Sequence, residues 1–86
     1  MPEISRFLGI VIAMYHADHA PPHIHAKYGG DEAMIRIDPP MLLDGHLPPR
    51  VLGLVIEWIT LNQPAILADW SRARQRQPLE MIPPLT

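Results

Sequence analysis

The sequence predicts an α+β fold, with a small antiparallel β-sheet of three to four strands in the N-terminal part and two C-terminal α-helices packed on one face. Up to about residue 43, short apolar or alternating segments are separated by glycine- and proline-containing turns. From residue 48 onward, apolar side chains recur at helical spacing. Strands followed by helices are typical of a sheet that helices cover on one side. Because 86 residues is short even for one domain, we expect a single domain spanning residues 1–86.

The expected strands lie between turn-forming residues. Phe7–His16 is rich in isoleucine, valine and aromatic residues, and its side chains are apolar at both odd and even positions. This pattern predicts a central strand that is covered on both faces. His23–Tyr28 alternates polar and apolar residues. A Gly-Gly-Asp turn at residues 29–31 joins it to a third strand, Glu32–Asp38, in a hairpin. Met41–Leu43 is a candidate for a short fourth strand.

The two expected helices are bounded by prolines. Prolines 48 and 49 suit the first turn of a helix, and apolar residues from Val51 to Trp58 follow the i, i+3, i+4, i+7 pattern. Asn62 before Pro64 predicts the end of this helix. A second helix is expected from about Pro64 to Gln75, with buried positions at Ile66, Leu67, Trp70 and Ala73.

Composition excludes several classes of protein. The chain has no cysteine, which excludes disulfides and thiolate metal sites and suits a reducing compartment. No apolar run approaches the ~20 residues needed to cross a bilayer, and the first residues do not resemble a signal peptide. We therefore expect a cytoplasmic protein without a membrane segment. The net charge of −2 does not indicate the basic surface that is typical of nucleic-acid-binding domains.

A histidine cluster is the segment richest in chemical groups. Four histidines and Asp18 fall within the ten residues 16–25. His23 and His25 occupy alternate strand positions, so they share a face about 6.6 Å apart. With His19 they would form a three-imidazole site of the catalytic zinc type, whereas two imidazoles with Asp18 would suit iron, manganese or zinc. Candidate metal ligands are thus His19, His23, His25 and Asp18, and candidate ions are zinc, iron, manganese and nickel.

Metal-free roles for the cluster remain open. Asp18 could orient His19 or His25 in a hydrogen-bonded network, with Tyr28 or Tyr15 donating nearby. The candidate catalytic residues for such a network are His19, His25, Asp18 and Tyr28. Alternatively, the cluster forms a patch that binds a partner, or its hydrogen bonds only hold the fold.

The sequence resembles, over nearly its whole length, a bacterial family known as domain of unknown function 4160. The matching positions are Pro2, Ile4-Ser5-Arg6-Phe7, Gly9, Met14-Tyr15, Asp18-His19, Pro22-His23, His25-Ala26, Tyr28-Gly29, Gly45, Leu47-Pro48, Glu57-Trp58, Leu67, Trp70, Pro78-Leu79, Ile82 and Pro84-Leu85. In this resemblance Asp18, His19, His23, His25 and Tyr28 belong to the family motif, and His16 is a variable position. Family genes often lie beside a second small gene in an arrangement that looks like a toxin–antitoxin pair.

Three functions are compatible with these observations. The first is an interaction component of a two-gene, toxin–antitoxin-like system, which binds a small protein partner encoded nearby and holds a divalent metal in the cluster. The second is a metal- or histidine-dependent hydrolase or nuclease, with Arg72 or Arg74 steering phosphate. The third is a purely structural module, a homodimer or partner-binding subunit, whose second sheet face (Phe7, Val11 and Tyr15) is buried on assembly.

Overall fold

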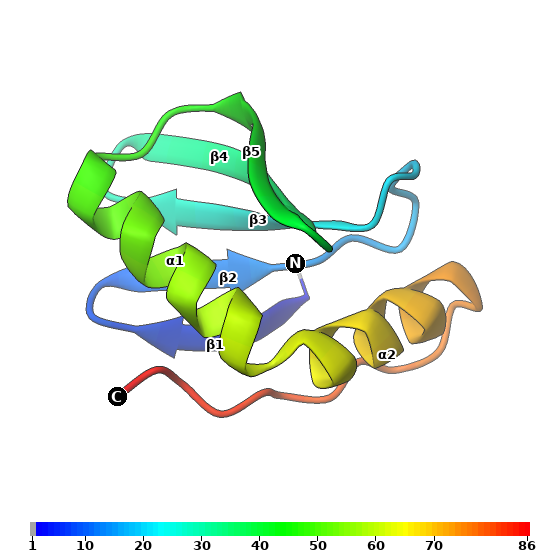
Figure 1. Ribbon diagram of the computed structural model, residues 1–86. Helices are drawn as coiled ribbons and strands as arrows, with labels where there is room; N and C mark the ends of the chain where they lie inside the picture. Colours follow the sequence, from blue (N-terminus) through cyan, green and yellow to red (C-terminus); the bar gives the residue numbers. More distant parts are fainter. Residues whose placement is uncertain (1) are drawn as a thin grey trace.

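The computed structural model describes residues 2–86 and consists of a five-stranded antiparallel sheet followed by two helices (Figure 1). The strand order in the sheet is the order in the chain, so each strand pairs with its neighbour in sequence. The strands are β1 (Glu3–Phe7), β2 (Ile10–Ala13), β3 (His23–Tyr28), β4 (Asp31–Ile37) and β5 (Pro40–Gly45), and the helices are α1 (Pro49–Leu61) and α2 (Gln63–Arg74). The predicted α+β fold is confirmed, with five strands rather than three to four.

The additional strand, β1, lies almost entirely before the segment Phe7–His16 that was predicted as one strand, and a turn near the start of that segment separates β1 from β2. Leu8 and Gly9 both have positive φ, 51° and 79°, and fold the chain back so that Phe7 pairs with Ile10. A two-residue turn with φ > 0 at both positions is a type favoured in hairpins because its twist matches the strands. The prediction of a continuous strand over Phe7–His16 is therefore wrong, because the apolar residues on both sides of Gly9 concealed the turn.

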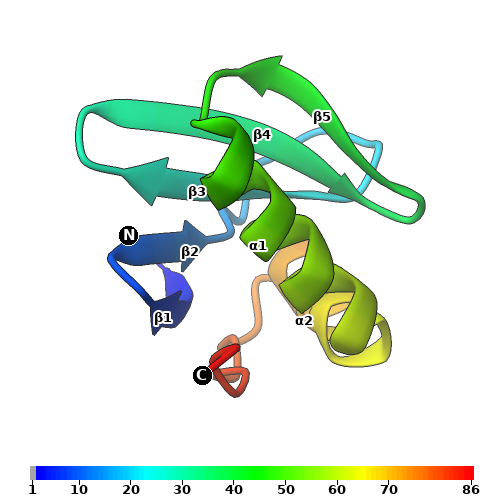
Figure 2. The ribbon, with the colours of Figure 1, turned by 60° about the vertical axis from the view of Figure 1, so that its left-hand side comes forward.

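The hydrophobic core lies between one face of the sheet and the helices. Figure 2 shows α1 and α2 on the same side of the curved sheet. The alternation predicted for β3 and β4 is confirmed at Ile24 and Ala26 and at Ala33, Ile35 and Ile37, which are buried, but Tyr28 at the end of β3 is exposed. The buried apolar residues of these strands and of α1 are Ile24, Ala26, Ala33, Ile35, Ile37, Val51, Val55, Trp58 and Ile59.

Phe7 belongs to this core, which corrects the expectation that it lies on an open second face with Val11 and Tyr15. The Phe7 ring is buried and lies 5.7 Å, centroid to centroid, from the ring of Trp58. The turn at Leu8 and Gly9 changes the alternation, so Phe7 faces the helices. The apolar face proposed for a partner is thus not formed by these residues.

The C-terminal segment, residues 77–86, covers the outer edge of β1. The backbone N–H of Ile82 donates to the carbonyl of Ile4 at 2.8 Å, and the indole N–H of Trp58 donates to the carbonyl of Pro83 at 2.8 Å. In Figure 1 this segment runs beside β1. In the described chain, β5 is consequently the sheet edge that has no strand or tail beside it.

A buried carboxylate connects α2 to this C-terminal segment. Of the four positions predicted to be buried in α2, three are buried, but Leu67 is half-buried and Asp69 is fully buried. Oδ1 of Asp69 accepts from Nη1 of Arg72 at 2.8 Å and from the backbone N–H of Glu80 at 2.9 Å. These two bonds fix the turn that follows α2.

Within residues 2–86, neither helix alone has the length and apolar character to cross a membrane. The two helices pass that test only when they are taken together, and their axes are bent by 86° at the break between them.

Candidate metal centre

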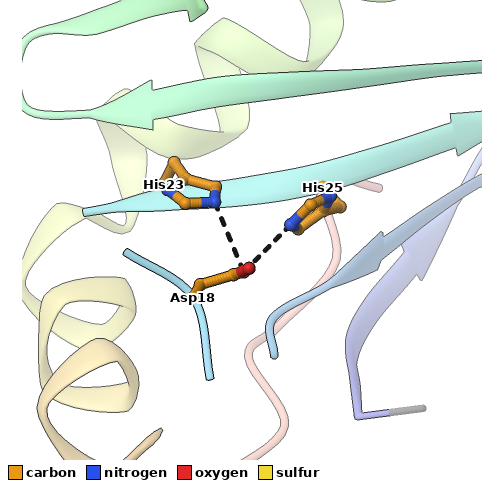
Figure 3. Close-up of side chains that lie close together, drawn as sticks. All are labelled: Asp18, His23 and His25. Atoms are coloured by element: carbon orange, nitrogen blue, oxygen red, sulfur yellow. Dashed lines mark hydrogen bonds and ion pairs between the residues drawn. The ribbon is translucent and has the colours of Figure 1, made fainter. Parts of the chain in front are cut away.

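The loop between β2 and β3 brings Asp18 to two histidines of β3 (Figure 3). His23 and His25 alternate with Ile24 and Ala26, so the two histidines share one face of β3, and His23 is buried. Asp18 approaches them from the loop, and both imidazoles direct Nε2 toward its carboxylate. Residues from two segments thus converge on one point.

The geometry of this group is close to that of a metal site. Oδ2 of Asp18 lies 2.9 Å from Nε2 of His25 and 3.3 Å from Nε2 of His23. One donor atom from each of the three residues lies within 4.8 Å of the other two. Ligand atoms bonded at ~2.0–2.1 Å to a tetrahedral ion are separated by roughly 3.3 Å. Small side-chain movements would therefore suffice to bind an ion.

The site is largely shielded from solvent. The side chains of His23, His25 and Asp18 are 3%, 12% and 21% exposed. The Trp70 ring packs against His23 at 5.3 Å, and the Tyr15 ring meets His25 edge-on at 4.5 Å, both centroid to centroid. Shielding strengthens electrostatic interactions within the group, because little water remains to screen them.

The hydrogen bonds of His23 fix which of its nitrogens carries the proton. Nδ1 lies 2.8 Å from the carbonyl oxygen of Pro21, and a carbonyl can only accept, so Nδ1 carries the hydrogen. In the neutral ring, Nε2 then presents a lone pair. This atom is buried, has no hydrogen-bond partner within residues 2–86, and faces the Asp18 carboxylate. A cation between these two atoms, either a metal ion or a proton on Nε2, would stabilise this contact.

His25 has a similar arrangement. Its Nε2 is hydrogen-bonded to Asp18, and its Nδ1 lies 3.5 Å from Oε2 of Glu32. Metal-binding imidazoles usually direct the other ring nitrogen to a carbonyl or a carboxylate, which fixes the tautomer and the orientation of the ring. Pro21 supplies the carbonyl for His23, and Glu32 supplies the carboxylate for His25. Both histidines direct Nε2 toward Asp18, but a hydrogen bond on Nδ1 holds only the His23 ring, because Nδ1 of His25 has no hydrogen-bond partner within residues 2–86.

The other predicted site residues lie elsewhere. His19 is exposed and does not belong to the group of three. Tyr28 is at the far end of β3, where it lines a cavity of about 320 Å³ with residues of α1 and Leu8. Nε2 of His16 lies 3.4 Å from the carbonyl of Gln77. The structure thus brings together Asp18, His23 and His25, and Tyr15 rather than Tyr28 is the tyrosine beside them.

Glu32 and the Pro21 carbonyl are the parts of the site that the sequence analysis missed. A two-residue turn at the predicted hairpin places Glu32 opposite Lys27, on the same face as His25. That register was available from the sequence and could have identified Glu32. The carbonyl of Pro21 had no such signal, because its direction depends on the conformation of the loop.

A cavity of about 240 Å³ lies beside His25. It is lined by His25, Glu32, Ala33, Met34, Asp44 and Gly45. The cavity therefore borders the carboxylate that faces Nδ1 of His25.

Comparison with known proteins identifies the family. Residues 9–71 match the family model described as "Domain of unknown function (DUF4160)", a span that includes all three residues of the candidate metal centre. The chain belongs to the DUF4160 family. No curated protein and no solved structure matches it. Membership in DUF4160 supplies no activity, so the function has to be argued from the site itself.

Proposed function

We propose that this DUF4160 protein binds one divalent metal ion through Asp18, His23 and His25. The observation that carries the proposal is the buried Nε2 of His23, whose lone pair faces the Asp18 carboxylate at 3.3 Å. A metal ion between these atoms would accept a lone pair from each and form two coordinate bonds. The Pro21 carbonyl that accepts from Nδ1 of His23 supports the same assignment, and the Glu32 carboxylate lies 3.5 Å from Nδ1 of His25.

The ligand set favours particular ions. Two imidazoles and one carboxylate suit zinc and iron(II), which commonly keep further positions for water or another ligand. Manganese and nickel are further candidates, because imidazole and carboxylate also bind them. With no cysteine in the chain, thiolate ligands from this protein are excluded.

The proposal assigns the metal a role in presenting the β2–β3 loop to a partner. Asp18 is half-buried, while its neighbours His16, Ala17, His19 and Ala20 are exposed. An ion held between Asp18 and β3 would fix the loop and order these exposed residues, which lowers the entropy cost of binding. We propose that the protein is a cytoplasmic interaction component of a two-gene, toxin–antitoxin-like system, and that a small protein encoded nearby binds this loop.

A hydrolytic function is the alternative; the cavity beside His25 adjoins one of the three residues, while Asp18 and His23 do not line it. A bound ion would supply a Lewis acid or an activated water. Phosphate steering by Arg72 lacks support, because this guanidinium is engaged by Asp69 at 2.8 Å and lies 3.7 Å from Glu80. Hydrolysis of model esters and phosphodiesters by the zinc-loaded protein, lost on removal of His25, would favour the enzyme.

Calorimetric titration of the metal-free protein with Zn²⁺ tests the metal proposal. We expect stoichiometric binding by the unmodified protein and by the control variant His16→Ala/His46→Ala, which removes two exposed histidines outside the group. We expect no comparable binding by His23→Ala/His25→Ala. Equal binding by both variants, or no binding by the unmodified protein, would contradict the proposal.

A further inference from the structure

The edge strand β5 has an unusually apolar surface. Met41 is 50% exposed, and Leu42 and Leu43 are each 38% exposed. Residues 77–86 cover the opposite edge of the sheet at β1, whereas nothing in the described chain pairs with the outer side of β5. An exposed apolar edge strand is a template for pairing with another strand, and proteins usually protect such edges with charges or a covering segment.

Two opposite charges mark the two ends of this edge. Arg36 of β4 pairs with Met41, and Asp44 pairs with Met34, so Arg36 and Asp44 share one face of the sheet. The Arg36 side chain extends over β5, because its Nε donates to the carbonyl of Pro39 at 3.1 Å and its Nη2 lies 3.3 Å from Sδ of Met41. The edge thus carries a cation near one end, an anion near the other, and leucines between them.

We infer that β5 pairs antiparallel with β5 of a second copy of this chain, around a two-fold axis between Leu42 and Leu43. This register places Asp44 of each copy opposite Met41 of the other copy. Adjacent strands are roughly 4.8 Å apart, and the Arg36 guanidinium already lies over Met41, so it can meet the carboxylate on the next strand. The two-fold axis repeats this ion pair at both ends and buries the leucines at the centre.

The charge arrangement selects a second copy over an unrelated strand. An interface around a two-fold axis must be self-complementary, and an edge with opposite charges at its two ends meets this requirement when paired antiparallel. Met34 pairs with Asp44 and Ile35 with Leu42, so Leu43 is the extra residue of a bulge in β5, beside the proposed two-fold axis. A bulge on an edge strand often hinders pairing, so this feature opposes the dimer. The inference does not depend on the metal centre.

Sedimentation velocity from micromolar to millimolar concentration, in chelator, tests this dimer. We expect a reversible monomer–dimer equilibrium. Arg36→Asp or Asp44→Arg alone would create like-charge pairs at both ends and weaken the dimer more than about tenfold. Mixing the two variants restores opposite charges at both ends, so the mixture should form a heterodimer. Glu57→Arg, a charge reversal at an exposed position of α1, serves as the matched control and should leave the dimer unchanged.

Three results would overturn the inference. The first is an unmodified protein that stays monomeric at every concentration. The second is a pair of single variants that dimerise as tightly as the unmodified protein. The third is a mixture of the two variants that remains monomeric while circular dichroism shows both to be folded.

Discussion

Nε2 of His23 lies 3.3 Å from Oδ2 of Asp18, while Nδ1 of the same ring is held by the Pro21 carbonyl at 2.8 Å. The second contact places a hydrogen on Nδ1, so in the neutral ring Nε2 is an acceptor that faces a carboxylate in a buried site. A cation between the two atoms, either a metal ion or a proton on Nε2, makes this contact favourable. This relationship, rather than the number of histidines, makes the group a candidate metal centre.

Replacing Asp18 by asparagine should weaken metal binding without lowering the stability of the metal-free protein. We expect the Zn²⁺ affinity to fall by about 100-fold or more, because a primary ligand contributes more than the outer partners that typically cost 10–100-fold. The metal-free variant should be at least as stable as the unmodified protein, since the new amide can donate to Nε2 of His23. Thermal unfolding in chelator and in excess Zn²⁺ measures both effects. A metal-free Asp18→Asn protein that is clearly destabilised would contradict this account of the contact.

Glu32→Gln tests the carboxylate behind His25. Glu32 is exposed, and its Oε2 lies 3.5 Å from Nδ1 of His25, so the loss of its charge should weaken Zn²⁺ binding by about 10- to 100-fold. Stability of the metal-free protein should change little. Asp31→Asn removes the same charge one position away, on the other face of β4, and should leave the affinity unchanged. If the two variants bind Zn²⁺ equally well, Glu32 does not position His25.

Two glycine-to-alanine substitutions should have opposite effects on stability. Gly45 has a φ of +84°, and a Cβ there would lie 2.2 Å from the carbonyl oxygen of Glu32, so Gly45→Ala should destabilise the fold by more than about 2 kcal/mol. Gly53 lies on the exposed side of α1 with open space around it, so Gly53→Ala should stabilise by about 0.5–1 kcal/mol. Urea unfolding of both variants measures the difference. A Gly45→Ala protein as stable as the Gly53→Ala protein would refute the described conformation of the end of β5.

Asp69→Ala should destabilise the fold through the turn after α2. Oδ1 of this buried carboxylate accepts from Arg72 and from the Glu80 backbone, and hydrogen bonds to charged groups contribute about 1.5–3 kcal/mol. We expect a loss of about 2–3 kcal/mol in the free energy of unfolding, with a smaller loss for Asp69→Asn, which retains an acceptor. Chemical denaturation measures both values. A loss below about 0.5 kcal/mol, the range of ordinary surface substitutions, would show that the connection contributes little.

The elements governed by local periodicity were predictable from the sequence. The alternation of β3 and β4 and the apolar spacing of α1 depend on neighbouring residues, and these elements lie within one or two residues of the expected bounds. The turn at Leu8 and Gly9 was missed because apolar residues on both faces gave no change of pattern there. The burial of Asp69 was missed because its partner Glu80 lies eleven residues away, beyond the reach of helical spacing.

For the candidate site, the sequence indicated the candidate ligands but not which of them lie together. His23 and His25 share a face by strand alternation, which local pattern can show. That Asp18 rather than His19 meets them depends on the path of the loop, and neighbouring residues in a loop have no fixed direction. The same holds for the Pro21 carbonyl, whose contact with His23 decides the tautomer.

The most direct measurement is elemental analysis of protein purified without a histidine tag, beside His23→Ala/His25→Ala and the His16→Ala/His46→Ala control. We expect near-stoichiometric zinc or iron, or else manganese or nickel, in the unmodified protein and the control, and its loss from His23→Ala/His25→Ala. Protein without bound metal that also takes up none on incubation with Zn²⁺, Fe²⁺, Mn²⁺ or Ni²⁺ would contradict the central claim and leave Asp18, His23 and His25 as a hydrogen-bonded group.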